Sequence, residues 1–115
     1  MQIKRKINEQ KWTIKIVTLK EMKKIADDTH TSGLCMASEK TIYIREDSVD
    51  YTTIAHELFH AYFSYLCLSS TNDISLDDAE EIAAEFFAAK GEAIVKKAKG
   101  VTRDLLKLHQ GKDVE

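Results

Sequence analysis

The chain of 115 residues contains no proline and only four glycines, the residues that most often interrupt regular structure or form linkers. The glycines are scattered, and no stretch rich in Gly or Ser separates one part of the sequence from another. Internal repeats are absent as well. With 43% apolar residues, residues 1–115 are expected to form a single domain with one hydrophobic core.

Strong net charge and long apolar runs are also lacking. The 17 basic and 19 acidic side chains leave a formal charge of −2, so no broad positive field favours nucleic acid or an anionic membrane. No stretch approaches the roughly 18 to 20 apolar residues of a membrane span, and the charged start does not have the pattern of a secretory signal. We expect a cytoplasmic protein that binds neither nucleic acid nor membrane.

Cysteine is scarce too, with only Cys35 and Cys67. A chain without an export signal usually meets a reducing compartment, where thiols stay reduced. We therefore expect two free thiols, with a single bridge between them as the alternative.

The pattern of apolar residues predicts an α+β fold. Alternation over residues 12–17 predicts a strand, and three-to-four spacing over residues 19–28 predicts a helix. An extended segment then begins at Gly33, and a short polar turn at residues 38–40 joins it to residues 41–45. This arrangement predicts a β-hairpin.

Helices are expected in the second half of the chain. Residues 51–67 form the first, with Ser48 or Asp50 as its N-cap. Ser75 can cap the next helix, which we expect to end near Lys99 because Gly100 follows. A last short helix is then predicted over residues 101–109.

The segment His56-Glu57-Leu58-Phe59-His60 carries the clearest chemical signal. On a helix, His56 and His60 project from one face and can bring two imidazole nitrogens to one metal ion. Glu57 lies one step around the helix, where a carboxylate can act as a general base without becoming a ligand. Such a pattern arises by chance in about a few chains per thousand of this length.

Catalytic zinc generally takes three protein ligands, so two histidines leave the site incomplete. The next predicted helix carries Glu80, Glu81 and Glu85. We choose Glu81 as the third ligand, with Glu80 as the alternative. Glu85, one turn after Glu81, is expected to accept a hydrogen bond from the far ring nitrogen of a zinc-binding histidine. Glutamates that only face water are the competing interpretation.

These residues resemble the gluzincin metallopeptidases, in which a glutamate from a later helix joins the two histidines of a His-Glu-x-x-His helix. More narrowly, the region from Gly33 to Gly91 is similar to the small ImmA/IrrE-type peptidases of bacterial, phage and mobile-element genomes. Two positions depart from the usual pattern. Phe59 stands where many members have glycine, and Glu85 stands where many gluzincins have aspartate.

The resemblance implies a small zincin-like domain, in which a short antiparallel or mixed sheet packs on the active-site helix and on a following glutamate-bearing helix. It implies a Zn²⁺-dependent endopeptidase with a peptide or protein substrate, such as a regulatory protein. It also assigns residues 41–45 to the strand edge that aligns the substrate. The sequence does not choose an oxyanion-stabilising residue from Tyr43, Tyr51, Tyr62 and Tyr65.

Two alternatives remain open at this stage. The chain could be a catalytically silent or latent metal-binding module for protein interaction, with the C-terminal segment 101–115 covering the cleft. A closed structural zinc site is the other alternative, but it would need a fourth protein ligand that the sequence does not make obvious.

Overall fold

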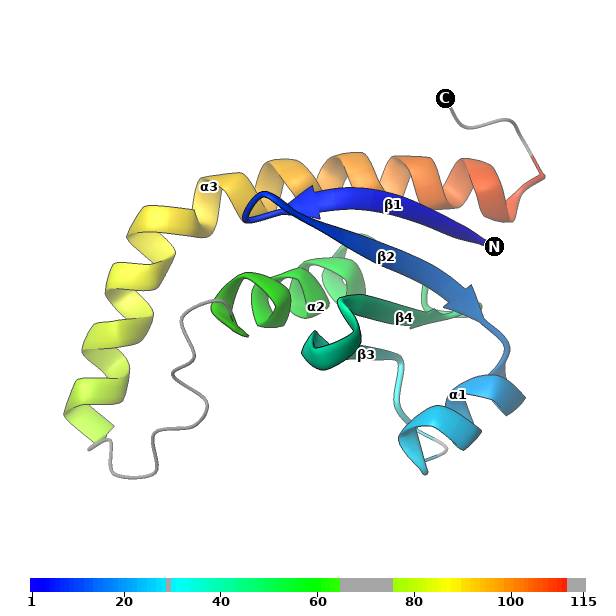
Figure 1. Ribbon diagram of the computed structural model, residues 1–115, viewed down its shortest axis with the longest axis horizontal. Helices are drawn as coiled ribbons and strands as arrows, with labels where there is room; N and C mark the ends of the chain where they lie inside the picture. Colours follow the sequence, from blue (N-terminus) through cyan, green and yellow to red (C-terminus); the bar gives the residue numbers. More distant parts are fainter. Residues whose placement is uncertain (29, 65–75, 112–115) are drawn as a thin grey trace.

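The computed structural model describes residues 1–28, 30–64 and 76–111. One mixed sheet of four strands packs against helices, which confirms the α+β class (Figure 1). The elements are β1 (Gln2–Ile7), β2 (Gln10–Val17), α1 (Leu19–Ala26), β3 (Gly33–Met36), β4 (Thr41–Arg45), α2 (Tyr51–Ser64) and α3 (Leu76–His109), with a 3-10 turn at Ala37–Glu39. None of the helices in these residues has the length and apolar character of a membrane span.

The strand order is β1-β2-β4-β3. β1 and β2 pair antiparallel, β2 and β4 pair parallel, and β4 and β3 form the predicted antiparallel hairpin. The expectation that residues 41–45 form the substrate edge is wrong, because β4 has a strand on each side and its backbone groups are already used. The edge strand of this hairpin is β3.

The first strand, β1, was not predicted from the sequence. Ile3 and Ile7 are 7% and 1% exposed, but three basic residues between them hide the alternation that marks a strand. A two-residue turn then leads into β2. Its residues, Asn8 and Glu9, have φ angles of 51° and 65°, as expected for a hairpin turn that follows the twist of its strands.

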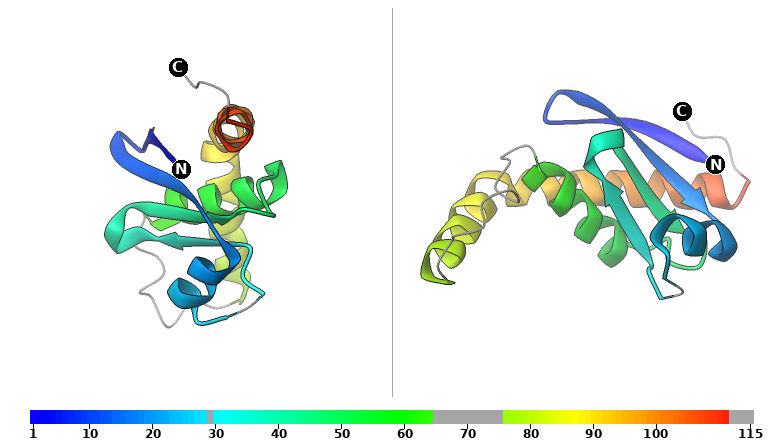
Figure 2. Two further views of the ribbon diagram at one scale, coloured as in Figure 1. Left: turned by 90° about the vertical axis from the view of Figure 1, so that its right-hand side faces the viewer. Right: turned by 60° about the horizontal axis from the view of Figure 1, so that its bottom comes forward.

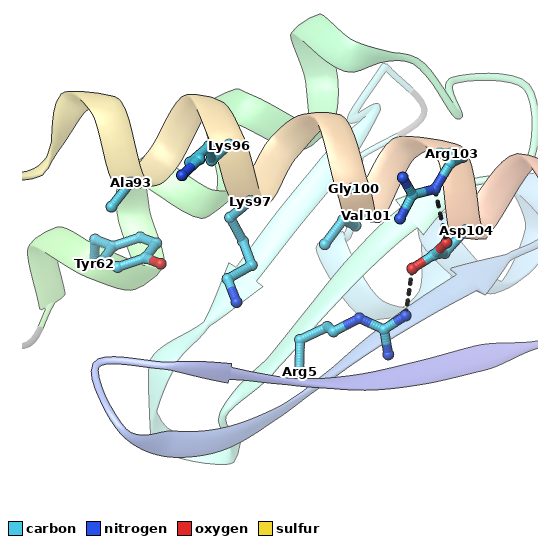
Figure 3. Close-up of a pocket in the computed structure, with 9 residues that line it drawn as sticks. All are labelled: Arg5, Tyr62, Ala93, Lys96, Lys97, Gly100, Val101, Arg103 and Asp104. Atoms are coloured by element: carbon cyan, nitrogen blue, oxygen red, sulfur yellow. Dashed lines mark hydrogen bonds and ion pairs between the residues drawn. The ribbon is translucent and has the colours of Figure 1, made fainter. Parts of the chain in front are cut away.

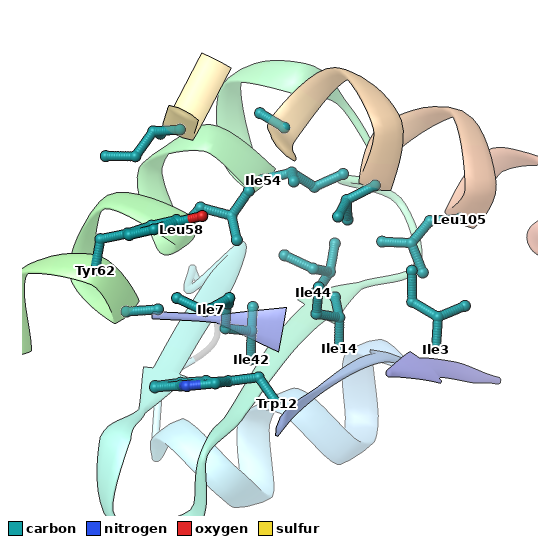
Figure 4. Packing of buried hydrophobic residues seen from close by; sticks show 14 of the residues in the cluster. Ile3, Ile7, Trp12, Ile14, Ile42, Ile44, Ile54, Leu58, Tyr62 and Leu105 are labelled. Carbon is teal, nitrogen blue, oxygen red and sulfur yellow. The ribbon is translucent and has the colours of Figure 1, made fainter. Parts of the chain in front are cut away.

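A row of paired residues crosses the sheet and builds the core. The row consists of Ile3, Ile14, Ile42 and Cys35, one from each strand in spatial order. The isoleucines of the sheet lie beneath Ile54 and Leu58 of α2 and beneath Leu105 of α3 (Figure 4). One face of the sheet is therefore covered by α2 and by α3.

Helix α2 begins with a side-chain cap and buries one stripe. The amide of Thr53 donates to Oδ1 of Asp50 at 2.8 Å, so Asp50 is the N-cap of the two candidates. Ile54, Leu58 and Ala61 are each at most 1% exposed and face the core. Their spacing fixes which side of α2 remains open to solvent. Residues 65–67, the expected end of this helix, lie outside the described residues.

Helix α3 runs through Gly100 without a break, so the predicted stop there and the separate helix over residues 101–109 are wrong. Ala98, Val101 and Leu105 are at most 1% exposed and continue one buried stripe across the glycine. One glycine inside a helix costs only about 1 kcal/mol, which this burial outweighs. The predicted cap, Ser75, lies outside the described residues.

The long helix α3 is bent (Figures 1 and 2). Its first part, yellow-green in Figure 1, points away from the sheet, whereas its last part runs beside β1. An ion pair between Arg5 of β1 and Asp104 of α3 joins these two elements. The sheet therefore holds the last part of α3, while the first part extends beyond it.

Two adjacent leucines of α3 test this packing. Leu105 is 0% exposed and Leu106 is 37% exposed. We expect Leu105→Ala to lower the free energy of unfolding by about 2 to 5 kcal/mol, because it leaves a cavity above the sheet. Leu106→Ala should cost much less, on the order of 0.5 kcal/mol. Urea unfolding followed by circular dichroism measures both values, and equal losses would contradict the orientation of α3.

Candidate metal centre

The two histidines of the motif lie on the open side of α2. Because Ile54, Leu58 and Ala61 face the sheet, His56 and His60 project from the other side of the helix, and both are exposed. Their Nε2 atoms lie 3.2 Å apart, and the ring centroids are separated by 4.8 Å. Two nitrogens thus converge on one point above the helix.

This spacing fits one zinc ion. An N–Zn bond in a tetrahedral site is about 2.0–2.1 Å long, so two imidazole nitrogens on the same ion lie about 3.3 Å apart. The observed separation of 3.2 Å agrees with that value. Without a metal, the same distance lets one ring donate an N–H hydrogen bond to the lone pair of the other.

The charge state of His60 also suits metal binding. Partial burial, assisted by the neighbouring His56, lowers the pKa of His60. Its ring is therefore neutral at neutral pH and keeps a nitrogen lone pair available. Protonation would remove that lone pair, so the pKa shift favours the form that can bind a metal.

The carboxylate of Glu57 is buried beside the histidines, with the residue only 6% exposed. Among the described residues, no group donates a hydrogen bond to it. Burial raises the pKa of Glu57, and the positive charge of His56 acts in the opposite direction. A carboxylate with a raised pKa is a stronger proton acceptor than an ordinary glutamate, which is what a general base requires.

Gly33, the first residue of β3, lies directly against Glu57. It pairs with Ile44 and so shares the sheet face that α2 covers. A Cβ atom on Gly33 would lie 2.9 Å from Cγ and 3.0 Å from Oε2 of Glu57, and 3.1 Å from Cγ2 of Thr53. Only a residue without a side chain lets β3 approach α2 this closely, so Gly33 sets the position of the carboxylate.

Two hollows meet at Gly33, His56 and Glu57. One, of about 400 Å³, extends past His60 and is bordered by Leu34, Cys35, Ala37, Phe63 and Ser64. The other, of about 320 Å³, extends in the opposite direction and is bordered by Thr31, Ser32, Thr52 and Thr53. The histidines and the buried carboxylate therefore lie midway along a cleft, with space on both sides.

Cys35 is a free thiol in the larger hollow. Burial raises its pKa to about 11, and the charge of Glu57 adds to the effect. The thiol is therefore protonated at neutral pH and has little of the thiolate character that a metal ligand needs. The expected free state of the other cysteine, Cys67, lies outside the described residues.

Three phenylalanines join α3 to α2 next to the histidines. The rings of Phe59 and Phe63 stack at 5.6 Å, and Phe86 of α3 meets them edge-on at 5.0 and 5.3 Å between centroids. Phe86 is 5% exposed and Phe59 is 37% exposed, so the contact is buried on the side of α3. This aromatic cluster holds α3 against α2 beside His60, because Phe59 is its neighbour in the sequence.

The acidic residues expected to complete the site lie on the first part of α3. Glu80, Glu81 and Glu85 are all exposed. In the part of the chain that the structure describes, no three His, Cys, Asp or Glu side chains gather at metal-binding distance. His56, Glu57 and His60 are thus brought together, whereas Glu81 as third ligand and Glu85 as its neighbour stay predictions.

Several cleft residues had no signal in the sequence. Gly33 was recognised only as the start of a strand, because its contact with Glu57 joins residues far apart in the chain. Phe63 borders the larger hollow, and nothing in the sequence distinguishes it from a phenylalanine of the core. Of the tyrosines considered for stabilising an oxyanion, Tyr43, Tyr51 and Tyr62 do not border either hollow, and Tyr65 lies outside the described residues.

Comparison with known proteins adds no assignment for this site. No family model, no curated protein and no solved structure matches the chain. The resemblance to gluzincin peptidases therefore rests on the motif residues alone.

Two glycines allow a matched test of the close approach at the site. We expect Gly33→Ala to lower the free energy of unfolding by about 1 to 3 kcal/mol, because the new Cβ overlaps Glu57. Gly100→Ala should instead raise it by about 0.4 to 1 kcal/mol, since Gly100 is helical and its Cβ would meet nothing closer than 3.9 Å. Chemical denaturation compares the two, and a stabilising Gly33→Ala would contradict the contact.

Proposed function

We propose that this chain is a zinc-dependent metallopeptidase that hydrolyses internal bonds of a peptide or protein substrate. The observation that carries the proposal is the separation of 3.2 Å between Nε2 of His56 and Nε2 of His60. That pair lies beside the buried carboxylate of Glu57 in an open cleft. If the histidines were incidental surface residues, the neighbouring strand would not need a glycine, Gly33, to make room for the carboxylate of Glu57.

In this proposal His56, His60 and Glu81 hold the zinc ion, with Glu80 as the alternative third ligand. The contact of Phe86 with α2 supports a ligand from this part of α3. Glu81 precedes Phe86 by five residues, a distance of about 7.5 Å along the helix axis. Glu85 lies next to that contact and is our candidate to orient a histidine ring through a hydrogen bond.

Bound zinc supplies a Lewis acid that lowers the pKa of water toward neutrality and polarises a carbonyl oxygen. Glu57 provides the proton transfers. Its carboxylate accepts a proton from the attacking water and later donates that proton to the leaving amine. The burial that raises the pKa of Glu57 supports both steps, because the same group must first accept and then release a proton.

The form of the cleft supports a peptide substrate cleaved at an internal bond. The two hollows extend in opposite directions from Glu57, so chain on both sides of the reacting bond has room. β3 borders the cleft and has no strand partner on its outer edge among the described residues. An extended peptide can pair with such an edge through its backbone.

A second candidate function is a metal-binding or interaction module that does not cleave. One observation favours it: no third ligand joins the histidine pair in the part of the chain described. If the chain is instead a latent enzyme, the first part of α3, which carries Glu81, would have to approach α2 to supply the third ligand before zinc binds with full affinity. Zinc content and cleavage, measured on the same variants, distinguish the two functions.

Replacement of Glu57 by glutamine separates metal binding from catalysis. Glutamine keeps the shape of the side chain but cannot accept the proton. We expect Glu57→Gln to retain one zinc per chain and to lose cleavage of an unstructured protein by about 100- to 10,000-fold. Metal analysis and a gel-based cleavage assay give the two readouts.

The matched control is Glu92→Gln, which makes the same change at an exposed position of α3 outside the cleft. It should keep both zinc and cleavage. Cleavage by Glu57→Gln at the wild-type rate would contradict the assigned base, whereas zinc without cleavage in the wild type would favour the non-catalytic module.

The third ligand is tested by three alanine variants. Loss of a group that only orients a ligand typically costs about 10- to 100-fold in metal affinity, so Glu81→Ala should cost more than about 100-fold and Glu85→Ala about 10- to 100-fold. Glu80→Ala should leave the affinity near wild type. Competition with a zinc chelator measures all three, and a large loss confined to Glu80→Ala would transfer the ligand role to Glu80.

A further inference from the structure

A second pocket lies outside the cleft, where β1, α2 and the last part of α3 meet (Figure 3). Its volume is about 450 Å³, within the range of pockets that bind small molecules. Gly100 forms part of its wall and leaves the space open, because a Cβ there would touch nothing closer than 3.9 Å. None of the residues proposed to bind zinc borders this pocket.

The charge of the pocket differs from that of the chain. Four cationic side chains and one carboxylate border it, in a protein with a net charge of −2. Asp104 receives hydrogen bonds from Arg5 and Arg103. Burial alone would favour its neutral form, but these hydrogen bonds hold the pKa of Asp104 below its ordinary value, so it is ionised and its single negative charge balances one of the two arginine charges.

Lys96 and Lys97 are the two cations of the pocket that have no ion-pair partner in the described part of the chain. Neither forms a hydrogen bond with any of the described residues. Lys97 is half-buried, and its ammonium group points toward β1 on the side of Arg5 (Figure 3). An ammonium group without an ion-pair partner at the wall of a pocket can pair with an anion that enters it.

The hydroxyl of a buried tyrosine points into the same space. Tyr62 of α2 is 6% exposed, and its hydroxyl is directed into the pocket (Figure 3). Among the described residues, no group forms a hydrogen bond with that hydroxyl. A tyrosine hydroxyl can donate one hydrogen bond, so this donor is available to a ligand.

We propose that this pocket binds the phosphate group of a small anionic ligand. Lys97 and Lys96 supply the charge, and the hydroxyl of Tyr62 donates a hydrogen bond to a phosphate oxygen. Lysine ammonium groups bind phosphate as point charges, and hydrogen bonds to ionised groups are among the stronger ones in proteins. The volume leaves room for more than the phosphate group, so a phosphate ester is favoured over the free ion.

The proposal is tested by calorimetric titration of the intact protein with inorganic phosphate, AMP and adenosine at constant ionic strength. Phosphate and AMP should bind, with AMP the tighter of the two, and adenosine should not. Binding of inorganic phosphate without AMP would still support the anion site and would identify the free ion as its ligand. Absence of binding by both anions at millimolar concentrations would overturn the proposal.

Variants assign the binding to this pocket. Lys97→Gln should weaken AMP binding by about tenfold or more, because a charged hydrogen bond is lost. Tyr62→Phe keeps the buried ring and should weaken binding by about two- to tenfold. Lys99→Gln removes the same charge from an exposed position of α3 that does not border the pocket, and it should bind as wild type does. Equal losses for Lys97→Gln and Lys99→Gln would show only a general charge effect and would also overturn the proposal.

Discussion

The packing of α2 on the inner face of the sheet is the constraint on which the candidate site depends. Ile54, Leu58 and Ala61 must face the core, since each is at most 1% exposed. Helical periodicity then turns His56 and His60 outward and places the carboxylate of Glu57 at the seam with β3. The seam closes only because Gly33 has no side chain. Core packing and site geometry therefore depend on each other, and a change in either alters the other.

The sequence was most informative where a pattern is local. The α+β class, the β3–β4 hairpin and α2 follow from alternation, turn residues and three-to-four spacing. The His-Glu-x-x-His spacing likewise predicts the convergence of two imidazoles, because both residues belong to one helix. β1 was missed, since basic residues hide its alternation, and the break at Gly100 was wrong, since the buried stripe of α3 continues past the glycine.

Features that join distant parts of the chain could not be predicted in the same way. The sheet order decides that β3, rather than β4, is the edge strand beside the cleft. The contact between Gly33 and Glu57, the aromatic cluster around Phe86 and the cationic pocket all depend on how α2 and α3 cross the sheet. The place of Glu81 depends on the bend of α3, which its sequence does not mark with proline.

One measurement bears most directly on the proposed metal centre: X-ray absorption at the zinc edge on the purified, zinc-loaded protein. Ligation by His56 and His60 with a carboxylate and water predicts only nitrogen and oxygen neighbours near about 2.0–2.2 Å, including the outer-shell signal of two imidazoles. That imidazole signal should vanish from the double variant with alanine at both histidine positions. A sulfur neighbour at about 2.3 Å, or zinc bound without imidazole, would contradict the assignment.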